Sequence, residues 1–309
     1  MNRTYRDGAP HHVFSKGVDG NIVFYTRDDC LYYITLYSCY ARRYGIRTLS
    51  FSLMPNHTHS FQYAPSKNVF LAFNQELISH FTTGYNNQHN RTGPVFQKPF
   101  GYAPKMVGKK IRSCISYICN NAPVGNLTDD ILSYRWNLVA YIRKENPFSP
   151  KIALDHVSIR LRRSLKMVDY FRARDMPVGY ETLKILFSDL NKTEKSQLID
   201  YIVSHYEILD KRSLDEFFGS FSKAMIAMEA NGGSENDIQE DWEDYSSYSS
   251  LSRIAMEEGV CLDGVNFEQM ASDEIIRLAN AMMVRSRATK RQIEKFLHLH
   301  PGGQHADSQ

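Results

Sequence analysis

"IRTLSFSLMPNHTHSFQYA", residues 46–64, decides the fold because it holds two strands joined by a sharp turn. Its first half alternates apolar with Thr and Ser side chains, the pattern of a half-buried strand, and the apolar positions are Leu49, Phe51 and Leu53. A Met-Pro-Asn turn follows, and the next residues predict an antiparallel neighbour. A strand places His57 and His59 on one face, with α-carbons about 6.5 Å apart. The two histidines therefore either bind one metal ion together or only share a sheet face.

The segments around this hairpin alternate between strand and helix patterns. We expect strands at 11–17, 46–54, 57–64 and within 93–104, and helices at 27–45, 66–88 and 108–121. Gly45 is placed to end the first of these helices. The order β-α-β-β-α-β-α predicts an α+β domain in which an antiparallel sheet is backed by helices.

The remainder of the chain has a predominantly helical pattern after Pro147 and Pro150. Asn191, with Glu194 three residues later, predicts a capped helix start. The predicted organisation is an α+β domain at 1–148, a helical region at 149–228, an acidic Gly/Ser-rich linker or loop at 229–252, a helical segment at 253–300 and a disordered tail at 301–309.

Composition indicates a globular protein with an uneven charge. The chain has 309 residues and a formal net charge of +3, yet its first 150 residues contain 17 Lys and Arg against 8 Asp and Glu. A basic half of this kind is compatible with a nucleic-acid partner. The five cysteines form no CxxC pair, which argues against a disulfide framework. Because no apolar run approaches eighteen residues and the first residues lack the apolar core of a signal peptide, we expect a cytoplasmic protein without membrane spans.

A second group of polar residues lies in "SYICNN", residues 116–121. Tyr117 and Asn121 are four positions apart, so on a helix they are neighbours on one face. A phenol and an amide oxygen would then point the same way. By itself this pattern also fits a core tyrosine beside a helix-terminal asparagine.

Taken together, these motifs resemble the single-tyrosine HUH transposases, specifically the REP-associated branch. The resemblance covers about residues 10–145 and rests on "LMPNHTHSF", on "FQKPF" at 96–100 and on "SYICNNAPVGNL" at 116–127, in this order. The sequence departs from the family where Ala122 separates the asparagine from the proline. If the match to the family motif slips by one residue, Asn120 takes the position of the motif's asparagine in place of Asn121. Thr58, which is usually apolar in the family, Ser60 and Gln62 make the other face of the strand polar, which predicts either a looser core or a polar network.

The resemblance implies a ferredoxin- or RRM-like catalytic domain that nicks and rejoins single-stranded DNA, near hairpins. Tyr117 would be the nucleophile and form a 5′-phosphotyrosine. His57 and His59, with Asn121 as third ligand, would bind a divalent ion, Mg or Mn, that neutralises charge at the scissile phosphate. The sequence contains no P-loop motif, and rejoining through a phosphotyrosine needs no nucleotide cofactor.

Basic residues mark two further candidate DNA contacts. The first group precedes the tyrosine helix and consists of Lys105, Lys109, Lys110 and Arg112. The second is in "RATKRQIEKFLHL", 287–299, which resembles the recognition part of a helix-turn-helix, with Arg287, Lys290 and Arg291 facing out and Ile293, Phe296 and Leu297 facing in. Two other functions stay open: a non-catalytic DNA-binding regulator derived from such a transposase, and a metal-dependent hydrolase in which the His-x-His pair begins a barrel. The sequence also leaves monomer and homodimer open.

Overall fold

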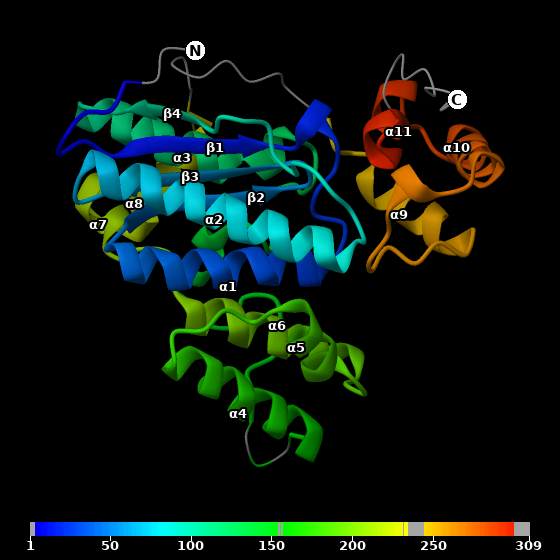
Figure 1. Cartoon of the computed structure of the whole chain (residues 1–309). Coiled ribbons are helices and arrows are strands. Elements are labelled where there is room, and N and C mark those ends of the chain that lie inside the picture. Colours follow the sequence, from blue (N-terminus) through cyan, green and yellow to red (C-terminus); the bar gives the residue numbers. More distant parts are fainter. Residues whose placement is uncertain (1–3, 154, 156, 231, 234–243, 300–309) are drawn as a thin grey trace.

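A single four-stranded sheet lies at the centre of the computed structural model, which describes residues 4–153, 155, 157–230, 232–233 and 244–299. The strand order is β2-β3-β1-β4 and neighbouring strands are antiparallel (Figure 1). The strands are β1 His11–Lys16, β2 Arg47–Met54, β3 His57–Tyr63 and β4 Gly101–Pro104. With two intervening helices this is the split βαβ arrangement of ferredoxin-like domains. The predicted α+β fold is confirmed.

Helices cover both faces of the sheet. Helices α1 (Arg27–Tyr44) and α2 (Lys67–Gln88) lie on one face and α3 (Gly108–Val124) lies on the other (Figure 1). Helix α1 begins at a capping box formed by Thr26 and Asp29. It ends where expected, at Gly45, whose φ of 63° is readily adopted by glycine.

The polar face of β3 packs on α1 and α2 through a hydrogen-bonded network. The Tyr37 hydroxyl lies 2.9 Å from Thr48 Oγ1 and donates to Gln62 Oε1 at 3.1 Å. Gln62 Nε2 donates in turn to Asn74 Oδ1 at 3.1 Å. Because these buried polar groups bond to one another, the face needs no looser packing. Of the two expectations for this face, the polar network is the one observed.

A β-bulge interrupts the simple alternation expected for β2. The register with β3 shifts between Thr48 and Ser50. As a result, Leu49 packs with the residues of α3, whereas Phe51 and Leu53 pack in the core beneath α1. The expectation that these three apolar residues share one face is wrong, because the extra residue reverses the side on which Leu49 lies.

The helices after the sheet domain form two groups beside it. In Figure 1, α4 to α6 lie below α1, and α7 and α8 lie beside α3; their bounds are α4 Ile159–Ala173, α5 Tyr180–Phe187, α6 Lys192–Tyr206, α7 Ser213–Phe218 and α8 Phe221–Ala230. The predicted capping box of Asn191 and Glu194 starts α6. Asp200 of this helix is buried and accepts hydrogen bonds from Arg135 and Tyr141, which fixes α6 to the segment after α3. Short 3-10 helices lie at Val18–Gly20, Leu138–Tyr141 and Phe267–Gln269.

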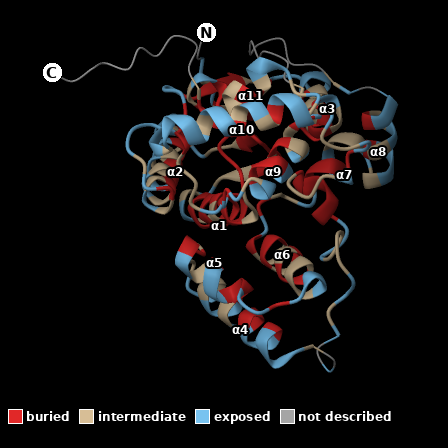
Figure 2. Cartoon of the chain, turned by 90° about the vertical axis from the view of Figure 1, so that its right-hand side faces the viewer, coloured by how far each residue is buried: buried red, intermediate tan, exposed pale blue. Residues whose placement is uncertain are grey.

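The last three helices form a C-terminal unit at one end of the sheet, and their bounds are α9 Tyr248–Glu257, α10 Ser272–Arg285 and α11 Lys290–Leu297 (Figure 1). The outer side of α10 is largely exposed, whereas Ile293, Phe296 and Leu297 of α11 are buried as predicted (Figure 2). The unit docks on the sheet domain, because the Ile22 N–H donates to the Lys295 carbonyl at 3.1 Å and the Tyr25 hydroxyl donates to the Phe296 carbonyl.

Parts of two predicted segments lie outside the described residues. These are 231 and 234–243 of the predicted linker at 229–252, and the whole predicted tail at 301–309. The linker's final residues begin helix α9. Among the residues that the structure does describe, no helix is long and apolar enough to cross a membrane.

Candidate active site

The hairpin turn and β3 bring His57 and His59 together on the face of the sheet that α3 covers. Their ring centroids lie 4.6 Å apart and the rings are nearly perpendicular, at 88°. His59 is fully buried, whereas His57 is half-buried. Each ring places a nitrogen about 2.1 Å from an ion that it binds. At this centroid separation the two rings are close enough to reach one divalent ion together.

His12 on the adjacent strand extends this pair to three histidines. Strand β1 pairs with β3 so that His12 lies opposite Phe61, which places it diagonally beside His59 on the same face. His12 Nε2 and His59 Nδ1 are hydrogen-bonded at 2.9 Å, and both side chains are buried. One of these nitrogens must donate and the other accept, so the bond couples the tautomers of the two rings. It uses the Nδ1 atom of His59, so Nε2 is the atom through which this ring would bind an ion.

The Nδ1 atom of His57 contacts two oxygens, one from the preceding residue and one from the C-terminal part of the chain. It lies 2.6 Å from Asn56 Oδ1 and 3.2 Å from the Tyr245 hydroxyl, which also donates to Asn56 Oδ1. Asn56 Nδ2 donates to the Gly20 carbonyl at 2.8 Å, so this amide is itself fixed. Metal-binding histidines commonly donate their second ring N–H to an oxygen in this way, which fixes the ring. The arrangement leaves Nε2 of His57 as the nitrogen for an ion.

Burial holds the pKa of His57 well below its usual range, and the nearby His59, Lys16, His12 and Lys295 lower it further. His57 is therefore a neutral imidazole at neutral pH. The neutral ring is the form that binds metal ions.

Helix α3 places the ring of Tyr117 against the buried histidines. The Tyr117 ring centroid lies 5.9 Å from that of His59 and 5.8 Å from that of His12, in edge-on contacts. The apolar face of α3, which includes Ile111, packs toward the sheet, and the half-buried tyrosine adjoins that face. The structure therefore places Tyr117 next to His59 of the predicted pair, and next to His12.

The two asparagines at the end of α3 have different surroundings. Asn120 is buried, and its Nδ2 donates to the carbonyls of Ser116 and Met228, so this side chain is committed to the contact with α8. Asn121 is half-buried, and its Nδ2 donates to the Tyr117 carbonyl at 3.1 Å. Because the Asn120 side chain is bonded to α8 and that of Asn121 is bonded within α3, Asn121 remains the candidate for the third ligand.

No group of three or more His, Cys, Asp or Glu side chains within the described residues is arranged to hold a metal ion. The site instead offers two imidazoles, with oxygen donors still required. Mg and Mn accept such donors from amides, phosphates and water.

The predicted DNA-binding residues ahead of Tyr117 differ in their surroundings. Lys105 is buried ahead of α3, and Lys110 is exposed. Lys109 and Arg112 line a groove of ≈ 660 Å³ together with Lys223 of α8. The same groove reaches Gly233, where an added Cβ would lie 2.5 Å from the Tyr117 backbone nitrogen, so this segment passes directly against the tyrosine helix.

In the C-terminal unit, Arg287 and Lys290 are exposed, and Lys290 Nζ lies 3.7 Å from Glu294. Arg291 lines a cavity next to the sheet domain.

Three residues of the site were not assigned to it by the sequence: His12, Asn56 and Tyr245. His12 lies in the predicted strand at 11–17 and Asn56 in the predicted turn, and neither position by itself indicates a role in the site. The antiparallel pairing of β1 with β3, had it been known, would have placed His12 beside His59. No local signal connects Tyr245 with His57, because 188 positions separate them.

No protein-family model matches the chain, and no curated protein matches it. Among solved structures, the chain is similar to a REP-associated tyrosine transposase bound to a REP hairpin. The identity is 15%, the match covers 45% of this chain and 81% of the other, and the TM-score is 0.38. A likeness of this extent carries no conclusion about activity, which has to be argued from the site.

Proposed function

We propose that the protein is a metal-dependent DNA strand transferase that nicks and rejoins single-stranded DNA near hairpins. The observation that carries the proposal is the convergence of Tyr117 with His57 and His59 on one face of the sheet. A phenol beside a metal-competent imidazole pair supplies both a nucleophile and a means of holding a phosphate. The basic groove along α3 supports a polyanionic substrate.

In the proposed reaction, Tyr117 Oη attacks the scissile phosphorus and displaces the 3′-oxygen, leaving a 5′-phosphotyrosine. The phenol proton leaves as the new bond forms, and His12, whose ring contacts that of Tyr117 and which is not assigned to the ion, is the candidate acceptor. The displaced 3′-oxygen takes up a proton and becomes a 3′-hydroxyl. His57, His59 and Asn121 would hold a Mg or Mn ion, which would neutralise charge that develops on the phosphate oxygens. Attack of a 3′-hydroxyl on the phosphotyrosine then rejoins a strand and releases Tyr117.

The test is the formation of a covalent protein–DNA adduct on denaturing gels with end-labelled single-stranded DNA. The protein should form an adduct that requires Mg or Mn. Tyr117→Phe, which retains the ring, should form none while binding DNA nearly as well as the unaltered protein. His57→Ala and His59→Ala should each abolish the adduct, and Asn121→Ala should reduce it less, because water can occupy one ligand position.

The alternatives predict other outcomes. A non-catalytic regulator would bind DNA without any adduct under every metal condition. The metal-dependent hydrolase would release product without a covalent intermediate; its expected barrel is not the fold, since the described strands form an open four-stranded sheet.

A further inference from the structure

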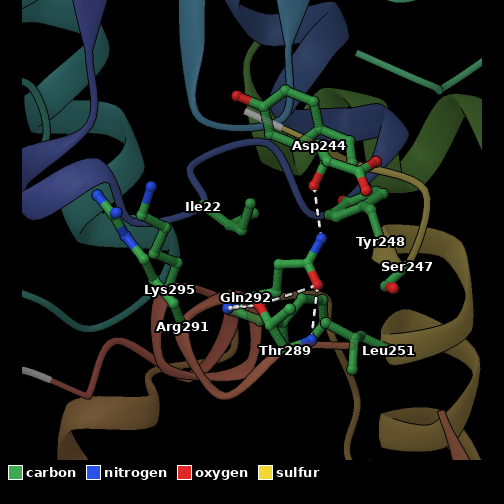
Figure 3. A pocket seen from close by; sticks show the side chains of 11 residues that line it. Ile22, Asp244, Ser247, Tyr248, Leu251, Thr289, Arg291, Gln292 and Lys295 are labelled. Carbon is green, nitrogen blue, oxygen red and sulfur yellow. Dashed lines mark hydrogen bonds between the residues drawn. The ribbon is translucent and has the colours of Figure 1, made fainter. Parts of the chain in front are cut away.

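A cavity of ≈ 450 Å³ lies where the C-terminal unit meets the sheet domain. Its walls come from the turn before α9, from α11 and from Ile22 of the segment before α1. Figure 3 shows Arg291 and Lys295 on one side and Ser247 and Tyr248 on the other. A cavity of this size is within the usual range for small ligands and has room for one nucleotide.

The cavity adjoins the candidate active site through a shared side chain. Tyr245 lines the cavity, and its hydroxyl contacts both Asn56 and Nδ1 of His57. Lys295 also lines it, and the charge of this residue is one of those that lower the His57 pKa. The side chain of Tyr245 therefore lines the cavity and also contacts His57.

One side of the cavity suits a phosphate. Arg291 and Lys295 are four positions apart on α11 and so lie on one helix face. Within the part of the chain that the structure describes, the exposed Arg291 guanidinium has no ion-pair partner. The carboxylate of Asp244, the acidic residue of the lining, accepts hydrogen bonds from Asn126 Nδ2 and from the Ser246 N–H.

The opposite side suits a base. Tyr248 is half-buried and offers a ring against which a base can stack, and its hydroxyl is already committed to the Phe24 carbonyl at 2.6 Å. The Ser247 hydroxyl, for which the described residues supply no hydrogen-bond partner, can bond to a base edge. Gln292 is less available, because its Nε2 donates to the Asp244 carbonyl and its Oε1 accepts from the Thr289 N–H.

We propose that this cavity binds one unpaired nucleotide of the DNA strand, directly next to the phosphate at the histidine pair. Its phosphate contacts Arg291 and Lys295, and its base lies against Tyr248 and Ser247. The position relative to the scissile phosphate rests on the proposed function. The consequence is that the C-terminal unit, through its contact with the catalytic site, selects which nucleotide flanks the cleavage point.

The test is photo-crosslinking of the full-length protein to single-stranded DNA that carries one 4-thiothymidine, moved one position at a time. The expected result is a crosslink to residues 245–251 or 289–296, found by peptide mass spectrometry, from a probe base within two nucleotides of the adduct position. Ser247→Leu, which fills the cavity, should remove that crosslink. Crosslinks confined to other surfaces, such as the groove of Lys109, Arg112 and Lys223, would overturn the proposal.

A binding measurement gives an independent readout. Arg291→Gln should weaken single-stranded DNA binding about 3- to 10-fold and lower the slope of log affinity against log salt by about 0.7, the value for one phosphate contact. The matched control is Arg277→Gln, which removes an exposed arginine of α10 away from the cavity. Equal effects of the two substitutions would overturn the proposal. A protein that crosslinks at the cavity but forms no adduct would instead refute the strand-transfer chemistry alone.

Discussion

Replacing Tyr245 by Phe removes one oxygen from the candidate metal site and retains the ring that packs near Gly125 and Met54. The lost hydroxyl bonds to Asn56 Oδ1 and lies 3.2 Å from His57 Nδ1. A buried hydrogen bond of this kind contributes about 1 kcal/mol to the free energy of unfolding. Loss of a partner that orients a ligand typically lowers metal affinity about 10- to 100-fold. We expect Tyr245→Phe to weaken Mn binding about 10-fold.

The matched control is Tyr25→Phe, since the Tyr25 hydroxyl also joins the C-terminal unit to the sheet domain but donates to the Phe296 carbonyl. Both variants should unfold with a free energy about 1 kcal/mol smaller than that of the unaltered protein, as measured by denaturant titration. Calorimetric titration with Mn, without DNA, then shows whether Mn affinity depends on the contact between the C-terminal unit and the sheet domain, which both variants weaken, or on the orientation of His57, which only Tyr245→Phe changes. Unchanged Mn affinity in both variants would contradict this prediction, and so would an equal loss of Mn affinity in both.

Three further predictions concern pH, DNA affinity and stability. Burial lowers the pKa of His11 to about 4, so the unfolded chain binds a proton at this residue more readily than the folded chain does. The associated stability is complete above about pH 6.5 and is lost as the pH falls toward 4. His11→Gln should lessen this loss by about 2 kcal/mol, as measured by denaturant titrations at pH 6.5 and pH 4. Lys109→Gln combined with Arg112→Gln should lower the salt slope of single-stranded DNA binding by about 1.4, and an unchanged slope would exclude the groove from the DNA path. Asp200→Ala leaves Arg135 without its buried carboxylate and should destabilise the fold by about 3 kcal/mol in thermal unfolding, with Mn affinity unchanged.

Local patterns were sufficient to predict the elements of the sheet domain. The period-two alternation in β2 and β3, the helical stripes of α1 to α3 and the glycine at 45 each depend on residues within one element. The polar face of β3 was also readable, because Thr58, Ser60 and Gln62 recur at every second position. Its partners on α1 and α2 required the folded arrangement.

What the sequence did not reveal depends on contacts between distant segments. The bulge at Leu49 is a property of strand pairing, and alternation alone predicts the opposite face for this residue. The His12–His59 bond depends on the β1–β3 register across 47 positions, and Tyr245 reaches His57 across 188. Periodicity specifies which face a side chain occupies, but it does not specify which other segment covers that face.

The most direct test of the central claim is the site of attachment in the protein–DNA adduct. Trypsin cleaves after Arg112 and Arg135, so Tyr117 and Tyr134 share one peptide and fragment ions distinguish them. The account predicts a nucleotide attached through phosphate to Tyr117. Attachment at Tyr134 or Tyr141, or no adduct with Mg or Mn under conditions in which the protein binds the DNA, would contradict it.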